Sequence, residues 1–145
     1  MKKVEIDSPS VQSYIGILQS VIGRMGSNSA SCKTWCITLV SAIIVVVSRK
    51  NNPCYIWIAM VPILLFFFLD SYYLGLEQCF RDLYNKFVEK LQEGEATIED
   101  VFIITPDADL LKTIVSTFKA ALSLSIWPFY IVLIVMLSIT EKFLF

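Results

Sequence analysis

The chain has 145 residues, of which 56% are hydrophobic and 17% are charged, and its mean hydropathy is +0.66. Soluble domains carry about 25% charged residues, so this composition favours a single-domain membrane protein over residues 1–145. The sequence contains no histidine, which excludes Ser-His-Asp and Cys-His catalysis, and its net charge of −1 gives no overall basic field for nucleic acid. We therefore expect a protein that is not an enzyme and has no cofactor or metal.

The region near the N-terminus predicts an amphipathic cytoplasmic helix over residues 9–25. Apolar residues recur at i, i+3, i+4 and i+7 between Val11 and Met25, and Ser8 or Ser10 stands where a helix cap is expected. Because the polar face carries no lysine, packing against another helix of the protein is favoured over binding at the lipid surface.

Two apolar runs, 30–48 and 54–76, predict a transmembrane hairpin whose basic turn lies at residues 49–53. The first helix has Lys33 near one end, where its side chain can extend to the lipid headgroups. The second carries Asp70 near the interface, and an ionisable group at that depth is costly unless it is paired. We expect Asp70 to pair with a lysine or arginine across a helix.

The second span is expected to continue into the cytoplasm as a helix over residues 77–92. No helix-breaking residue separates 77–92 from 54–76, and Gly94 then provides a helix end. The cytoplasmic part has an apolar stripe and a charged opposite face. We expect this stripe to pack on the stripe of residues 9–25, within one subunit or between subunits.

Residues 93–112 form a cytoplasmic connection. Residues 101–105 have β character, so either one short strand paired with a second copy or an extended loop is expected there. Residues 105–109 supply a cap, a proline and acidic residues for a helix start. That helix is expected to run into a third span at residues 119–140. Its uncharged core, Ala120–Thr140, covers about 31 Å, which matches a bilayer.

The basic residues predict the orientation, because lysine and arginine accumulate on the cytoplasmic side of membrane proteins. With three spans, nine basic residues share one side and three share the other. The nine are Lys2, Lys3, Arg24, Lys33, Arg81, Lys86, Lys90, Lys112 and Lys119, and the three are Arg49, Lys50 and Lys142. We expect a multi-pass protein of the bacterial inner membrane with a cytoplasmic N-terminus and a periplasmic C-terminus.

Two groups of side chains are candidates for function. Five basic residues predict a cytoplasmic ligand-binding surface, with ordinary positive-inside topology as the alternative: Arg24, Lys33, Arg81, Lys86 and Lys90. Six residues are candidates for lining or gating a pore, with helix–helix packing as the alternative for the polar ones: Thr38, Ser41, Val45, Phe66, Phe67 and Asp70. Three helices cannot enclose an ion path, so a channel requires a homo-oligomer. We expect a tetramer.

Two stretches resemble a family of small bacterial membrane proteins found in anti-phage defence loci. One runs from Arg24-Met25 through Asn28-Ser29 to Cys32-Lys33-Thr34-Trp35. The other comprises Leu69-Asp70, Tyr72-Tyr73-Leu74, Leu76-Glu77, Phe80-Arg81 and Tyr84. The resemblance covers roughly residues 17–90 and is closest to the membrane effectors of Hailong-type systems, with a looser similarity to two-span effectors of the SLATT group.

The resemblance implies an oligomeric ion channel that depolarises the infected cell, which is a form of abortive infection. It also implies a nucleotidyltransferase partner, which makes a nucleotide signal or short DNA oligomer that controls the channel. The residues themselves leave two alternatives open. One is a non-enzymatic membrane anchor or scaffold for a cytoplasmic partner, and the other is a holin-like protein, against which the long cytoplasmic helices argue.

Overall fold

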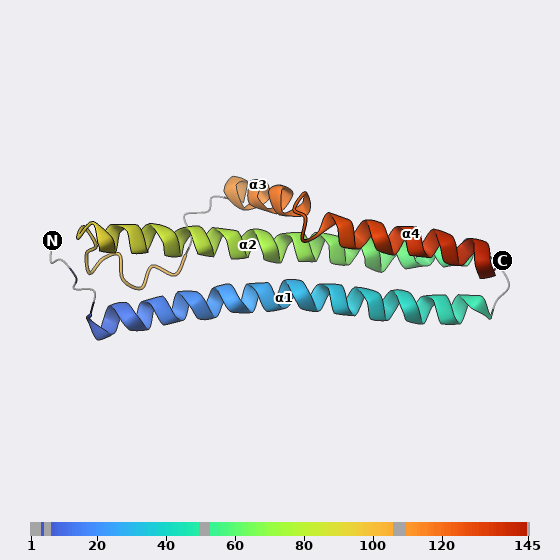
Figure 1. Cartoon of the computed structure of the whole chain (residues 1–145), viewed down its shortest axis with the longest axis horizontal. Coiled ribbons are helices and arrows are strands. Elements are labelled where there is room, and N and C mark those ends of the chain that lie inside the picture. Colours follow the sequence, from blue (N-terminus) through green and yellow to red (C-terminus); the bar gives the residue numbers. More distant parts are fainter. Residues whose placement is uncertain (1–3, 5–6, 50–52, 106–109, 145) are drawn as a thin grey trace.

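The computed structural model describes residues 4, 7–49, 53–105 and 110–144. It is all-helical and elongated, and the part described contains no strand (Figure 1). The elements in chain order are the helix α1 (Pro9–Ser48), the short 3-10 helix η1 (Pro53–Ala59) and the helices α2 (Met60–Gln92), α3 (Leu110–Ala121) and α4 (Trp127–Leu144). The predicted all-α class is confirmed.

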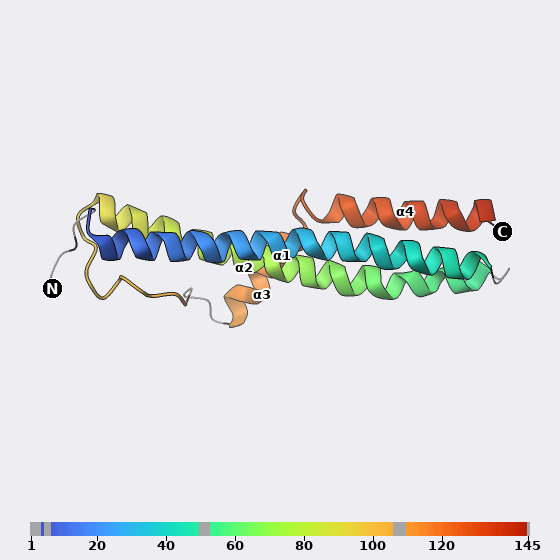
Figure 2. The same cartoon turned by 90° about the horizontal axis from the view of Figure 1, so that it is seen from below.

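Helix α1 is a single helix of 40 residues, so the segments predicted at 9–25 and 30–48 are joined without a break. Ser8 is the N-cap residue, with extended backbone angles and no capping hydrogen bond from its side chain, and Pro9 lies in the first turn. Glycine weakens an isolated helix, yet α2 runs alongside α1 over most of its length (Figures 1 and 2). That packing stabilises the glycine- and serine-rich middle of α1.

Helix α2 returns antiparallel to α1 and continues from the predicted span into residues 77–92 without interruption, as the sequence predicts. Its N-terminal boundary differs from the prediction, because the first turns after Pro53 form the 3-10 helix η1. The cause is Pro62, which has no N–H to donate and whose ring crowds the carbonyl of residue 58. Helix α2 ends at Gln92, and Gly94 follows with φ +69°, a conformation that glycine adopts freely.

Residues 93–105 form a loop along the α1–α2 hairpin with turns at 93–94 and 98–102, so the alternative of a strand at 101–105 is not borne out among the described residues. Two contacts attach the loop: the Val4 N–H donates to the Ala96 carbonyl at 3.1 Å, and the Tyr14 hydroxyl donates to the Ile103 carbonyl at 2.5 Å. The helix start predicted at 105–109 falls mostly on residues 106–109, which lie outside the described residues.

The third apolar segment is not one continuous helix, which corrects the prediction for residues 119–140. Helix α3 ends at Ala121 and α4 begins at Trp127, with turns between them. Pro128 explains the break, because it cannot donate to the carbonyl of residue 124 and disfavours helical geometry just before it. Ser123 stabilises the turn: its hydroxyl accepts the Ser125 N–H at 3.3 Å and its carbonyl accepts the Ile126 N–H at 2.9 Å.

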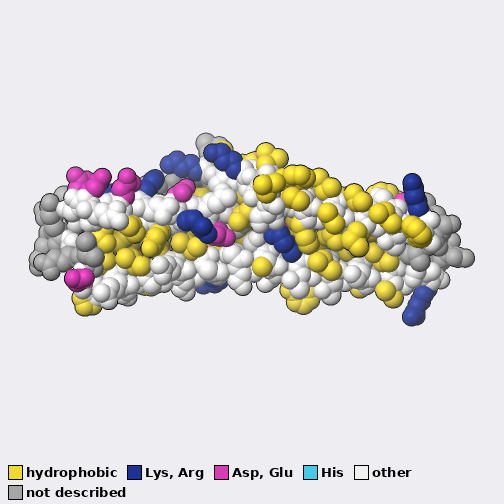
Figure 3. Space-filling model, viewed as in Figure 1, with side chains coloured by type: hydrophobic (Ala, Val, Ile, Leu, Met, Phe, Trp, Pro, Cys, Tyr) yellow, Lys and Arg dark blue, Asp and Glu magenta, His cyan; other side chains and the backbone are white. Residues whose placement is uncertain are grey.

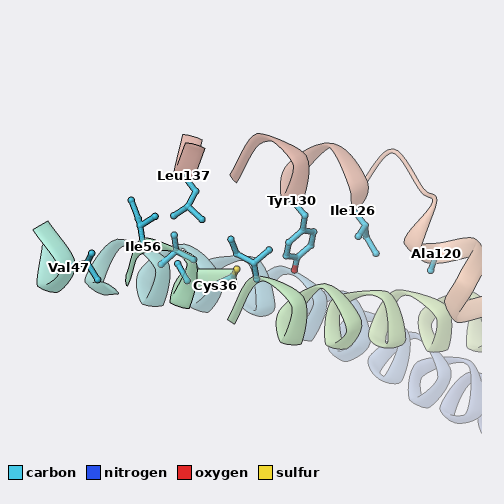
Figure 4. Close-up of a cluster of buried hydrophobic side chains, with 10 residues drawn as sticks. Cys36, Val47, Ile56, Ala120, Ile126, Tyr130 and Leu137 are labelled. Atoms are coloured by element: carbon cyan, nitrogen blue, oxygen red, sulfur yellow. The ribbon is translucent and has the colours of Figure 1, made fainter. Parts of the chain in front are cut away.

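Two apolar clusters fill the interior. The first confirms the predicted packing of the two amphipathic stripes, within one chain, and its buried members are Val11, Tyr14, Leu18, Phe87, Leu91, Ala96 and Val101. The second holds α1, η1, α2, the end of α3 and α4 together (Figure 4), and its buried members are Cys36, Val40, Val47, Ile56, Ala59, Ile63, Ala120, Ile126, Tyr130 and Leu137.

Among the described residues, two helical units are long and apolar enough to cross a membrane: α1, and the unit Tyr55–Gln92 that comprises most of η1 and α2. In their most apolar stretches only 22% and 33% of the residues are buried, whereas the core helix of a soluble protein is mostly buried. Exposed hydrophobic side chains gather over one half of the molecule, and charged side chains lie mainly over the other half (Figure 3).

Candidate functional site

A buried ion pair joins α1 to α2. The Lys33 Nζ lies 2.7 Å from Oδ2 of Asp70, whose side chain is fully buried, while that of Lys33 is 21% exposed. The Ser29 hydroxyl donates to Oδ1 of the same carboxylate, and the Tyr130 hydroxyl donates to Oδ2 at 3.3 Å. The predicted pairing of Asp70 across a helix is confirmed. Its partner is Lys33, whose ammonium group binds this carboxylate.

Tyr130 brings α4 into this polar cluster. Its ring meets that of Phe67 edge-on with centroids 5.3 Å apart, and its hydroxyl points from α4 towards the α1–α2 hairpin (Figure 4). One carboxylate therefore receives donors from two other helices. Because a buried charge without partners is strongly destabilising, the cluster of Ser29, Lys33, Asp70 and Tyr130 fixes how α1, α2 and α4 meet.

A second feature is a stripe of hydroxyl groups on the outer face of α1. Its members follow a regular spacing of three and four residues and all are exposed: Ser27, Ser31, Thr34, Thr38, Ser41 and Ser48, with Val45 in the same register. We call this set the hydroxyl stripe. At 100° per residue it lies roughly opposite the buried positions of α1, from Ser29 to Val47.

Several hydroxyls of the stripe donate to their own helix. The Thr38 hydroxyl donates to the Thr34 carbonyl at 2.9 Å, and Ser31 and Ser48 bond to carbonyls three or four residues earlier in the same way. Each of these oxygens still has lone pairs that can accept a hydrogen bond. The stripe is therefore compatible with an apolar surrounding and also able to contact water or ions.

The five basic candidates do not form a single site within one chain. Lys33 is paired with Asp70, Arg81 with Glu77 on the same helix, and Lys90 with Asp100 at 2.7 Å. Arg24 and Lys86 are exposed. Arg24 precedes Ser27 by three residues, so it continues the hydroxyl stripe in register.

The pore candidates divide between two environments. Thr38, Ser41 and Val45 share the exposed stripe, and Val45 is 57% exposed. Phe66 and Phe67 instead pack against the buried cluster around Tyr130, and Asp70 is itself buried, so these three face the interior of the chain. The structure thus brings three of the six candidates together on one outer face.

Three hydrogen bonds to Asp100 also hold the loop after α2. The Asp100 carboxylate accepts hydrogen bonds from Lys90 and from the Thr97 N–H and hydroxyl, at 2.7, 3.0 and 2.8 Å. The bond from Lys90, followed by those from Thr97, lowers the pKa of Asp100 to about 2. Burial, and then the charge of Asp100, raises the pKa of Tyr14, which stays neutral and donates to the loop.

Sequence reasoning missed Ser29 and Tyr130 as partners of Asp70. Ser29 precedes Lys33 by one helical turn, so its position on the same face could have been found from spacing. Tyr130 had no such signal, because its position depends on the break before α4. No family model, curated protein or solved structure matches this chain.

Proposed function

We propose that this chain is an integral membrane protein whose copies assemble into an ion channel, with the hydroxyl stripe of α1 facing the pore. The observation that carries the proposal is the stripe itself. Hydroxyl groups repeat along the outer face of α1, and the other residues of this helix between positions 34 and 48 are apolar. Lipid chains form no hydrogen bonds with such a row of hydroxyl groups, whereas water in a path between subunits does.

Exposed aromatic residues at two levels support membrane insertion. Trp35 and Tyr72, near the buried ion pair, are 61% and 44% exposed, while Tyr55 and Trp57, at the far end of the hairpin, are each 45% exposed. From Tyr55 to Tyr72 the chain rises about 27 Å, close to the roughly 30 Å hydrocarbon core of a bilayer. Tryptophan and tyrosine concentrate at both faces of a membrane.

Helix α4 supports a third crossing. Its 18 residues cover about 27 Å, and its outward side chains are apolar, among them Ile131, Val135 and Ile139. The Trp57 indole N–H donates to Oε1 of Glu141 at 3.2 Å, which places the end of α4 at the far end of the hairpin (Figure 1). With the nine-to-three distribution of basic residues, this supports a cytoplasmic N-terminus and an outward C-terminus.

The spacing of the stripe supports assembly. A repeat of three and four residues is the repeat of left-handed coiled coils, so neighbouring α1 helices can pack side by side around an axis. Arg24, at the cytoplasmic end of the same register, would then form a ring at the pore mouth. Such a ring suits control by an anionic ligand such as a nucleotide or short DNA oligomer.

The resemblance of residues 17–90 to anti-phage membrane effectors supports the biological role. In this proposal the channel depolarises the bacterial inner membrane during infection, under the control of the ligand. A membrane anchor or scaffold is the second candidate function. The observation that favours it is that hydroxyls of the stripe already donate to their own helix, so they do not require water.

Ion flux from liposomes separates the two candidates. The purified chain should release trapped potassium when a potential is applied, and Thr38→Leu with Ser41→Leu should reduce that flux at least tenfold because two large apolar side chains replace pore hydroxyls. Val46→Leu is the matched control, since Val46 is exposed on another side of α1. If folded, inserted wild-type protein releases no potassium, the channel proposal fails and the membrane anchor remains as the candidate function. Passage of whole proteins would indicate a holin-like pore.

A further inference from the structure

Helix α3 has its apolar side turned outward. The side towards α2 carries small and hydroxyl-bearing residues, namely Thr113, Ser116, Thr117 and Ala120, which are partly or fully buried. The outer side carries Ile114, Val115 and Phe118, which are 50%, 53% and 71% exposed. A helix on the surface of a soluble protein has the opposite arrangement, so this outer face requires an apolar surrounding.

The contact with α2 prevents α3 from turning this face inward. A Cβ atom placed on Gly75 would lie 2.9 Å from the backbone nitrogen of Thr117 and 3.0 Å from its Cα, so the two helices touch through their backbones. The Cys79 thiol also lies 3.4 Å from the Ser116 hydroxyl. These contacts fix the rotation of α3 and leave Phe118 outside.

Helix α3 lies at the edge of the apolar half of the molecule. Gly75 follows Asp70 by five residues, or about 7.5 Å along α2. Beyond α3 the exposed apolar surface continues through Leu122 and Leu124, which are 79% and 82% exposed. Figure 3 shows the hydrophobic side chains over the end of α3 running into the apolar band. Figure 2 shows α3 crossing the long axis of the molecule obliquely.

The charges of α3 match an anionic lipid surface. Leu110–Ala121 contains Lys112 and Lys119 and no acidic residue, and the side chain of Lys119 is exposed next to Phe118. Basic residues beside an exposed apolar face are typical of helices that lie at the membrane interface.

We propose that α3 docks into the inner-leaflet interface, with Ile114, Val115 and Phe118 among the lipid chains and Lys119 at anionic headgroups. The inference rests on the proposed membrane insertion and adds a lipid-binding surface to it. Because α3 is seated on Gly75, this surface also holds the point where α2 leaves the membrane.

Spin-label accessibility in nanodiscs tests the position of α3. In a full-length background with Cys54→Ser and Cys79→Ser, labels are placed by Phe118→Cys, by Leu65→Cys as a membrane reference and by Glu89→Cys as an aqueous reference. Cys32 and Cys36 are buried. The background protein without any added cysteine checks that these two residues take up no label. Collision rates are measured with oxygen, which enters lipid, and with a water-soluble nickel chelate.

At position 118 we expect oxygen collisions to exceed nickel collisions, as at position 65 and opposite to position 89. The label should lie deeper with phosphatidylglycerol than with phosphatidylcholine alone, and Lys119→Gln should remove that difference whereas Lys142→Gln, at the other end, should not. If nickel collisions dominate at position 118 while oxygen collisions dominate at position 65, the inference about α3 is overturned and the proposed membrane insertion stands. Low access to both reagents with spin–spin coupling shows a second copy instead, and nickel access at both positions overturns membrane insertion.

Discussion

A carboxylate that is fully buried, as Asp70 is, needs donors to keep its charge, and the sequence predicts that need from the cost of an unpaired charge at membrane depth. The identity of the partner does not follow so directly. Lys33 is found only when the register of α1 against α2 is known, and Tyr130 only when α4 is placed. The sequence therefore predicts that Asp70 needs hydrogen-bond donors, whereas the identity of those donors depends on tertiary packing.

Removing the charge of Asp70 should be strongly destabilising. Asp70→Asn leaves the Lys33 ammonium without its counter-ion, and breaking a buried pair in this way costs about 3–5 kcal/mol. Arg81→Gln, which breaks the exposed pair with Glu77 on one helix, should cost only about 0.5 kcal/mol. Thermal unfolding in detergent measures both. Equal losses for the two variants would show that the Lys33–Asp70 pair is not held as described.

The loop after α2 should loosen in acid. The folded-state pKa of Asp100 is lowered from its usual 3.8 to about 2, so the stabilisation is complete above the unfolded-state value and is lost as the pH falls towards about 2. Proteolysis of residues 96–105 by an acid-active protease should therefore accelerate between these two pH values. Asp100→Asn should be cleaved quickly at every pH, and a wild-type rate that is flat in this range would contradict the assignment.

At the scale of the elements, the sequence predicted the helical hairpin, the continuity of α2 into residues 77–92 and the meeting of the two amphipathic stripes. It did not predict that α1 is continuous, because Gly23, Gly26 and the serines after them resemble a linker until α2 supplies a packing surface. The break before α4 had a visible signal in Pro128. The uncharged composition of Ala120–Thr140 outweighed that signal in the prediction.

The seat of α3 on α2 predicts that Gly75 tolerates no side chain. Gly75→Ala should separate the helices and reduce stability by about 1–3 kcal/mol, and it should speed maleimide labelling of Cys79, whose thiol contacts Ser116. Gly23→Ala is the control, since a Cβ there meets nothing within 4 Å and alanine favours a helix. Unchanged stability and labelling in Gly75→Ala would show that α3 does not rest on this position.

At the scale of the whole molecule, charge and apolarity are separated along one axis, with most of the charge at the N-terminal end of the hairpin (Figure 3). One continuous helix, α1, joins the two halves and carries both Arg24 and the hydroxyl stripe. In the proposed channel, a ligand bound near Arg24 would therefore act directly on the helix that is proposed to line the pore. The sequence predicted helices that continue between cytoplasm and membrane at residues 54–92 and at the third span, but it divided α1 into two segments, so the shared register of Arg24 and the stripe emerged only with a continuous α1.

Ligand control should depend on Arg24. A short anionic DNA oligomer applied to the cytoplasmic side should change the wild-type conductance, and Arg24→Glu should weaken that response at least tenfold because it replaces attraction of the anion with repulsion. Lys142→Glu is the charge-matched control at the opposite end. Planar-bilayer recordings at several oligomer concentrations measure the response, and an unaltered response in Arg24→Glu would place the ligand elsewhere.

Cysteine accessibility in the conducting protein tests most directly whether the hydroxyl stripe lines a pore. Thr38→Cys, Ser41→Cys and Val46→Cys are each reconstituted, and a charged, water-soluble methanethiosulfonate is applied while current is recorded. The stripe predicts rapid loss of current at positions 38 and 41 and none at position 46, whose side chain is exposed on another side of α1. Loss of current at position 46 with no effect at 38 and 41 would contradict the assignment of this face to the pore.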